Sequence, residues 1–319
     1  MMKEPILTVA GLCAGYGEKP MVSDVSFALG QGEIFCIVGE SGCGKSTLLK
    51  AILGAAPELR VLGGSIALRG EELTAMPEAR RRKLCTEKMG MVFQNPGSAF
   101  NPIRSYKKQF IETLKSHGAY RPNSFLSQVR EAFDKLGLED CQRILQSCPY
   151  EMSGGMNQRI AMALALLLGQ EILLADEPTS ALDATVQMQM ARELRRLRDV
   201  SGIAQIIVTH NLALAEYLGD RIAVMYAGRV VELGKADQVL FSPRHPYTKS
   251  LIEAIPSLDG KMPAGLPGSP PMTGPEPRGC EFCPRCPRAG QACKTAAYAL
   301  ADTGGGHFAA CTGEKGGAA

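Results

Sequence analysis

The sequence has no apolar run that approaches the about 18 residues required for a membrane-spanning helix. Its longest apolar stretch, IAMALALLLG from Ile160, indicates a buried helix instead. The first residues, MMKEPILTVAGL, contain an apolar patch that is too short and too broken for a secretory signal. We therefore expect a cytoplasmic chain that is docked at most on a membrane complex.

The chain also has little net charge, +3 over 319 residues, and no long basic block. The one short basic run, RRRK at residues 80–83, indicates a solvated helix face, so nucleic acid is not indicated as a partner. No internal repeat is evident either, which excludes a tandem duplication of the motifs described below.

What the chain does have is an alternation of apolar and amphipathic segments. Short β segments are predicted over residues 6–28, and further strands at residues 32–39, 64–70, 171–177, 204–210, 222–228 and 229–233, with helices after several of them. Such alternation predicts a parallel sheet wrapped by helices, and the helical periodicity between about residues 105 and 150 predicts a helical insertion. From residue 256 the sequence is rich in Pro and Gly and predicts an extended linker before a cysteine-rich tail.

The most specific motif is VGESGCGKST at residues 38–47, placed between a predicted strand and a predicted helix. It fits the phosphate-loop pattern G-x-x-x-x-G-K-[ST], in which glycines let backbone N–H groups turn toward phosphate oxygens. The lysine is expected to reach the β- and γ-phosphates of ATP, and the following serine to bind Mg²⁺. The predicted ATP-binding residues are Gly39, Glu40, Ser41, Gly42, Cys43, Gly44, Lys45, Ser46 and Thr47.

One position in this loop, Cys43, invites a separate hypothesis. The cation of Lys45 and the helix N-terminus would both favour a thiolate, so we expect an unusually reactive cysteine. The alternative is a small residue that the loop tolerates.

A second cluster of charge follows the apolar strand ILLAD. Asp176 ends this strand, where a Mg²⁺ ion and its water shell need a negative partner, and Glu177 follows directly. Glu177 would act on the attacking water as general base or as the group that positions it. With a phosphate loop about 130 residues upstream, the pair predicts the second half of a nucleotide-hydrolysing site.

The segment YEMSGGMNQR between these two motifs resembles the signature motif of ABC transporter ATPases. The segment SALD at residues 180–183 is similar to the family's D-loop, and other single residues match its switch histidine, its Q-loop glutamine and its adenine-stacking aromatic. All elements fall in the family's order, over roughly residues 6–240. The residues concerned are Tyr16, Gln94, Ser153, Gly154, Gly155, Asp183 and His210.

The resemblance implies an α/β P-loop NTPase cassette with a parallel-sheet core, an antiparallel β subdomain and a helical subdomain. The ATPase domain would span residues 1–255, with the helical subdomain at about residues 95–160. It also implies that Glu177, His210 and Gln94 are catalytic and that Ser46, Gln94 and Asp176 hold Mg²⁺. In the family, the signature motif closes over ATP held by a partner cassette, so two cassettes form a head-to-tail dimer. Asn157 stands where related sequences carry arginine, and the sequence leaves open which contact this changes.

The C-terminal part resembles one branch of the family, the dipeptide/oligopeptide/nickel importer ATPases. The resemblance rests on FSPRHPYTKSLIEAIPS from residue 241 and on the cysteine-rich ending, which form an appended extension over residues 256–319. It implies a second ATPase, identical or different, two membrane permeases, and indirectly an extracytoplasmic binding protein, with the chain on the cytoplasmic face of the membrane.

The resemblance leaves the cargo open: peptides, or alternatively nickel or a metal–chelator complex. A soluble ABC ATPase of DNA repair or translation is less favoured, because such proteins carry a long coiled-coil insertion or two cassettes.

The tail holds five of the eleven cysteines. In a reducing compartment such crowding points to a metal rather than to disulfides. Cys280, Cys286, Cys293 and Cys311 match the branch's four cysteine positions, some members of which carry a 4Fe–4S cluster. Zinc and free thiols remain alternatives, and the additional Cys283 makes the choice of ligands ambiguous.

Overall fold

The computed structural model of the chain describes residues 4–92, 100–179, 183–255, 266, 268–269, 279–295 and 297–311. The chain divides into two compact units. The first comprises residues 1–4, 30–34 and 76–208, and the second comprises residues 5–29, 35–75 and 209–319.

The first unit contains three parallel strands in the order β8-β7-β6. Their bounds are β6 (Met89–Val92), β7 (Ile172–Asp176) and β8 (Ala204–Thr209). Strand β8 is buried along its whole length and β7 up to its last residue, which is why both read as continuous apolar runs rather than as alternating patterns.

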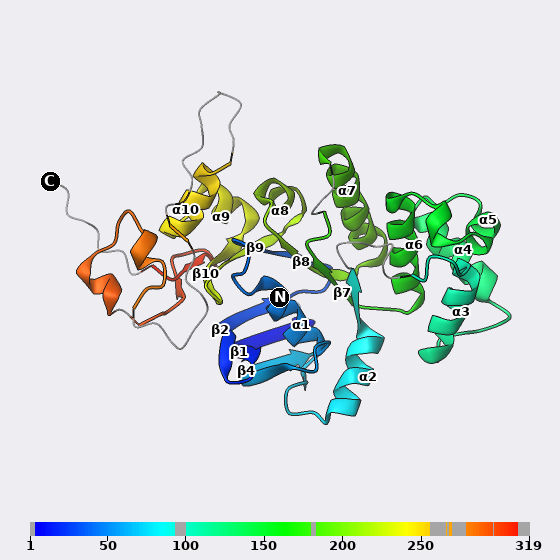
Figure 1. The fold of residues 1–319 in the computed structure, drawn as a ribbon, viewed down its shortest axis with the longest axis horizontal. Helices are drawn as coiled ribbons and strands as arrows, with labels where there is room; N and C mark the ends of the chain where they lie inside the picture. The colour runs from blue at the N-terminus through cyan, green and yellow to red at the C-terminus, as the bar shows by residue number, and fades with distance from the viewer. Residues whose placement is uncertain are drawn as a thin grey trace. The chain divides into compact units, whose positions relative to one another are not determined.

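Helices make up the rest of the first unit. In Figure 1, α3, α4 and α5 form a group beside α6, and α6 also packs against α7. The amphipathic α4 buries Val129 and Phe133 on one face, as its periodicity predicts. The short basic run lies on α2 and is mostly exposed, as expected. The bounds are α2 (Glu78–Lys88), α3 (Tyr106–Ser116), α4 (Phe125–Lys135), α5 (Cys141–Gln146), a 3₁₀ turn (Pro149–Glu151), α6 (Gly154–Leu167) and α7 (Ala184–Ser201).

The second unit contains an antiparallel sheet in the order β2-β1-β4-β5. Its strands are β1 (Leu7–Tyr16), β2 (Lys19–Leu29), β4 (Leu59–Leu68) and β5 (Glu71–Glu72). Helix α1 (Lys45–Leu53) packs against this sheet. The predicted strand at residues 64–70 thus overlaps the end of the longer β4.

The remaining strands of the second unit lie in the order β11-β12-β10-β9-β3. β3 and β9 are parallel, whereas β9, β10, β12 and β11 pair antiparallel. The strands are β3 (Ile34–Val38), β9 (Arg221–Tyr226), β10 (Arg229–Lys235), β11 (Ala301–Asp302) and β12 (Phe308–Ala309). The helices are α8 (Leu212–Leu218), α9 (Ala236–Phe241) and α10 (Pro246–Glu253), with 3₁₀ turns at Cys283–Arg285 and Gln291–Lys294.

None of the helices in the described ranges is both long enough and apolar enough to cross a membrane.

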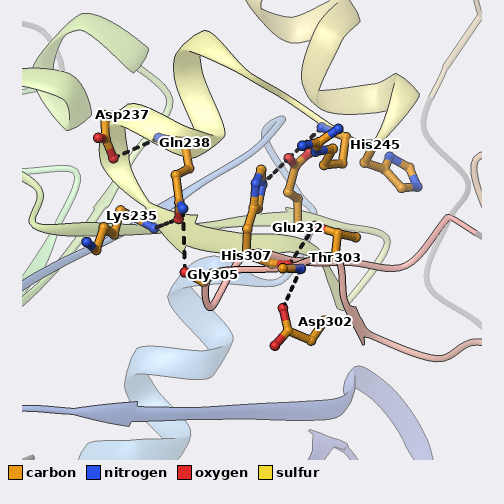
Figure 2. A network of polar contacts seen from close by, with 11 residues as sticks. Glu232, Lys235, Asp237, Gln238, His245, Asp302, Thr303, Gly305 and His307 are labelled. Atoms are coloured by element: carbon orange, nitrogen blue, oxygen red, sulfur yellow. Dashed lines mark hydrogen bonds and ion pairs between the residues drawn. The ribbon is translucent and has the colours of Figure 1, made fainter.

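The end of the chain docks on the second unit through β12, which pairs with β10. Glu232 of β10 pairs with Ala309 of β12, and its side chain is fully buried. It accepts hydrogen bonds from the backbone N–H groups of Arg244 at 2.7 Å and His245 at 2.9 Å. Nε2 of His307, from the tail, lies 2.7 Å from the same carboxylate (Figure 2). The buried carboxylate of Glu232 on β10 thus contacts both the segment before α10 and the tail.

Replacement of His307 by alanine removes one of the two hydrogen bonds at Oε1 of Glu232, so this oxygen keeps only the Arg244 N–H. We expect His307→Ala to lower the free energy of unfolding by about 1–3 kcal/mol, because a hydrogen bond to a buried carboxylate is lost. Urea unfolding of the full chain measures the change. As a control, Asp302→Ala in the same tail removes an exposed contact to the Gly304 N–H and is expected to change stability by only about 0.5 kcal/mol. Equal effects of the two variants would contradict the prediction.

Candidate active site

The phosphate loop follows β3 in the second unit, and two of its glycines have no possible substitute. Gly39 has φ +157°, and a Cβ there would lie 2.3 Å from the carbonyl oxygen of Met225. Gly44 has φ +100°, and its Cβ would lie 2.8 Å from the carbonyl oxygen of Met21. The backbone of the loop is therefore fixed against β9 on one side and β2 on the other, which leaves its N–H groups as the main ligand-binding atoms.

Lys45 is the cation of this loop, and its side chain is buried. Its Nζ donates hydrogen bonds to the carbonyl oxygens of Gly39 at 2.8 Å and Glu40 at 2.9 Å. The ammonium group thus lies inside the turn formed by the backbone. Lys45 is the first residue of helix α1, and Ser46 and Thr47 follow it in the first turn.

The expectation of a reactive Cys43 is wrong. The residue is 3 % exposed, and burial raises the pKa of its thiol. The nearby Lys45 cation and the hydrogen bonds from Lys45 oppose this effect but are the smaller contributions. The sequence showed the cation but not the depth of burial, which disfavours the thiolate.

Two further predicted residues belong to the second unit. Tyr16 ends β1, where it pairs with Lys19 and Leu59, and it is 39 % exposed. Its ring is therefore available for stacking. His210 follows β8 directly and is exposed, next to Asn211, which caps α8 by accepting a hydrogen bond from the N–H of Leu214.

Asp176 and Glu177 belong to the first unit. Asp176 is the last residue of β7 and pairs with Val208. Glu177 has φ +46°, an unusual conformation for a residue with a side chain, and its N–H donates to the carbonyl of Val208 at 2.9 Å. Such backbone conformations are energetically costly and gather at functional sites. Nothing in the sequence indicated this feature.

The signature segment forms the start of α6 in the first unit. Ser153 is the N-cap, and its hydroxyl accepts a hydrogen bond from the N–H of Met156 at 3.3 Å. Gly154 and Gly155 are the first two residues of the helix. Neither has a positive φ, a Cβ on Gly154 would meet nothing within 4 Å, and one on Gly155 would make an ordinary contact. Among the described residues, no packing within the chain requires glycine at these positions.

The role of Asn157, left open by the sequence, is visible in the structure. Its side chain is buried and accepts a hydrogen bond from the hydroxyl of Tyr106. Its amide nitrogen donates to the carbonyl oxygens of Pro149 at 3.0 Å and Met152 at 3.3 Å. Asn157 therefore ties the segment before the signature serine to α3, rather than facing a ligand.

Of the remaining predicted residues, Asp183 caps α7 by accepting hydrogen bonds from the N–H groups of Thr185 and Val186, both at 3.0 Å. Gln94 and the first three residues of SALD lie outside the described residues.

Comparison with known proteins matches these features to one family. Residues 22–180 match the family model of the ABC transporter, and residues 231–293 match the C-terminal region of oligopeptide/dipeptide transporters. The oligopeptide transport ATP-binding protein OppD of Haemophilus influenzae is 37 % identical over 92 % of both chains. The chain belongs to the ABC transporter ATPases.

OppD of Escherichia coli is a further relative, 39 % identical over 88 % of this chain and 84 % of its own length. Among solved structures, a dimeric ATP-binding cassette bound to ADP and Pi in a post-hydrolysis state has a TM-score of 0.59 at 26 % identity. The similarity covers 72 % of this chain and 98 % of that one. The predicted cassette fold is confirmed. The family membership makes the chain an ATPase that uses ATP and Mg²⁺ and works as a dimer with membrane partners.

The predicted 4Fe–4S cluster of this ABC ATPase finds no support. Among the described residues, no group of three or more His, Cys, Asp or Glu side chains could hold a metal ion. The four predicted ligands, Cys280, Cys286, Cys293 and Cys311, are present as free cysteines of the second unit.

The contact between Asn157 and Tyr106 predicts a measurable loss. We expect Tyr106→Phe to lower the free energy of unfolding by about 1–3 kcal/mol, because the buried amide oxygen of Asn157 then lacks its donor. The matched control is Tyr150→Phe in the adjacent turn, which is 70 % exposed and is expected to change stability by about 0.5 kcal/mol or less. Chemical denaturation measures both, and a silent Tyr106→Phe would show that Asn157 is held by other contacts.

Proposed function

We propose that the chain is the ATP-hydrolysing motor of a peptide importer. The proposal rests mainly on the phosphate loop that surrounds the buried ammonium of Lys45. In the same chain, residues 231–293 match the C-terminal region of oligopeptide/dipeptide transporters. The curated relatives named above are oligopeptide transport proteins, which favours peptides over nickel as cargo. The proposed organisation is an ATPase domain over residues 1–255, with a helical subdomain at about 95–160, and an appended region over 256–319.

In this role the predicted residues divide the work of binding and hydrolysing ATP. The backbone N–H groups of residues 39–47 bind the phosphates, with Lys45 on the β- and γ-phosphates, and Tyr16 stacks on the adenine. Ser46, Gln94 and Asp176 would hold Mg²⁺, which supplies neutralisation of the charge that develops on the phosphate oxygens. Glu177 accepts the proton of the water that attacks the γ-phosphorus, while the bond to the ADP oxygen breaks. His210 and Gln94 orient this water and the γ-phosphate.

The glycines of the signature segment support a site shared by two chains. Glycine costs about 1 kcal/mol relative to alanine inside a helix, and no crowding within the described chain explains Gly154 or Gly155. Bare backbone at an exposed helix N-terminus suits the approach of an anion from outside. We infer that Ser153, Gly154 and Gly155 close over ATP held by a second ATPase subunit, identical or different, and that Asp183 lies at that interface.

The coupled partners would be two permeases fed by an extracytoplasmic binding protein, with the chain on the cytoplasmic face of the membrane. This arrangement rests on the branch resemblance, and the peptide uptake experiment below tests its functional consequence.

Substitution of Glu177 separates binding from hydrolysis. We expect Glu177→Gln to slow ATP hydrolysis by about 100-fold or more while ATP binding persists, because only the proton acceptor is lost. The control is Glu171→Gln just before β7, which removes a part-exposed ion pair to Lys88 at 2.7 Å and is expected to keep the rate within about twofold. Phosphate release and equilibrium binding of ATP are the measurements. An unchanged rate in Glu177→Gln would remove the proposed chemistry.

The cargo is tested in cells that express the whole transport complex. We expect Lys45→Ala to abolish uptake of a labelled tri- or tetrapeptide, because the motor cannot hold its nucleotide. Uptake of ⁶³Ni²⁺ by the same cells should be the same with either form of the chain. A loss of nickel uptake with intact peptide uptake would contradict the peptide assignment and leave the ATPase assignment intact.

A further inference from the structure

The cysteine-rich tail reaches the phosphate loop through a side-chain pair that lies 245 residues apart in sequence. Nη1 of Arg285 donates to Oε2 of Glu40 at 2.7 Å, and Nη2 donates to Oε1 at 3.0 Å. Both residues belong to the second unit. Two parallel charge-assisted bonds of this kind fix direction as well as distance.

The tail presents Arg285 in a fixed position. The residue ends the 3₁₀ turn Cys283–Arg285 and is 7 % exposed. Phe282, directly before this turn, packs its ring against Tyr226 and Tyr247, with centroids 5.3 Å apart in both cases. The guanidinium itself lies over the ring of Tyr226. Its orientation toward Glu40 is therefore set by packing rather than by the ion pair alone.

Every polar group of Glu40 has a partner. Its N–H donates to the hydroxyl of Tyr247 on α10 at 3.0 Å, and its carbonyl accepts from Nζ of Lys45 at 2.9 Å. Its carboxylate is held by Arg285. Two of these three contacts come from outside the loop, from segments more than 200 residues downstream.

These contacts bear on ATP because Lys45 has two tasks. To reach the phosphates, its ammonium has to turn at least part of its hydrogen bonding away from the carbonyls of Gly39 and Glu40, which weakens the loop's internal contacts. Glu40 and the N–H groups that follow it are then held by Tyr247, by Arg285 and by the Cys43 N–H on the Glu40 carbonyl at 3.3 Å. A loop held in its binding geometry binds more tightly, since less ordering is required on binding. Arg285 also neutralises a carboxylate that would otherwise repel the phosphates.

We propose that Arg285 is a positioning residue of the ATP site: it acts through Glu40 to keep the phosphate loop in its ATP-binding geometry. The appended region is thereby a working part of the nucleotide site. The inference rests on the proposed binding of ATP at residues 39–47.

A second ion pair in the same tail provides the matched control. Nε of Arg229 on β10 lies 3.1 Å from Oε1 of Glu281, and both side chains are nearly buried. This pair also attaches the tail to β10, and the guanidinium of Arg229 lies over the ring of Tyr298. Burial raises the pKa of Glu281 to about 7, so at pH 8 the carboxylate is mostly charged and the pair is intact.

The experiment compares full-length variants at pH 8, with Mg-ATP binding measured by calorimetry and hydrolysis by phosphate release. We expect Arg285→Met to raise the Kd and KM for ATP about tenfold, with kcat within about twofold, because the loop rather than the reacting groups is disturbed. Arg285→Lys keeps the positive charge but cannot donate two parallel hydrogen bonds to the Glu40 carboxylate, and it should raise the Kd for ATP about threefold. Glu281→Gln should leave both constants unchanged within about twofold.

A double-mutant cycle tests the route through Glu40. If Arg285 acts through this carboxylate, Glu40→Gln combined with Arg285→Met should weaken binding no more than the weaker-binding single variant does. If the Kd of the double variant rises by the product of the two single increases, the proposal is overturned. It is also overturned if the Kd of Arg285→Met is no higher than that of Glu281→Gln. If Arg285→Met does not fold, Arg285→Lys and Glu40→Gln decide by the same comparison. Wild-type protein that binds no ATP would instead count against the proposed function.

Discussion

The buried ammonium of Lys45 is the contact on which the nucleotide site depends. A loop this poor in side chains has few atoms with which to hold its shape, and the lysine supplies them by donating to two of the loop's own carbonyls. The glycines at positions 39 and 44 then allow β9 and β2 to approach from either side. The same cation that stabilises the loop is the one that meets the phosphates, so ligand binding exchanges one set of acceptors for another.

This exchange explains why the outer contacts of Glu40 matter. In the structure the peptide after Gly39 is held by Lys45, Tyr247 and Arg285 together. Once the lysine turns to the phosphates, the contacts of Tyr247 and Arg285 remain, together with the Cys43 N–H on the carbonyl of Glu40. The tail and α10 therefore supply a larger share of the contacts that hold the loop when Lys45 meets phosphate, and their effect should be larger on the bound form of the loop than on the free form.

The fold and the motifs could largely be predicted from the sequence, because each rests on a short local pattern. The phosphate loop, the strand that ends in Asp176 and the helix that opens at Ser153 all lie where the spacing indicated. What could not be predicted are contacts between distant segments. The hydroxyl of Tyr106 on Asn157 is one case, since a polar residue in a helix carries no sign of what faces it. The raised pKa of the Cys43 thiol is another, because depth of burial decides between two opposing effects.

The tail is too short to bury a large core of its own, so its contacts with neighbouring segments matter for its stability. It packs its apolar and charged residues against the rest of the second unit: Phe282 between aromatic rings, Arg285 on the phosphate loop and His307 on a buried glutamate. This docking places the tail in direct contact with the nucleotide-binding loop.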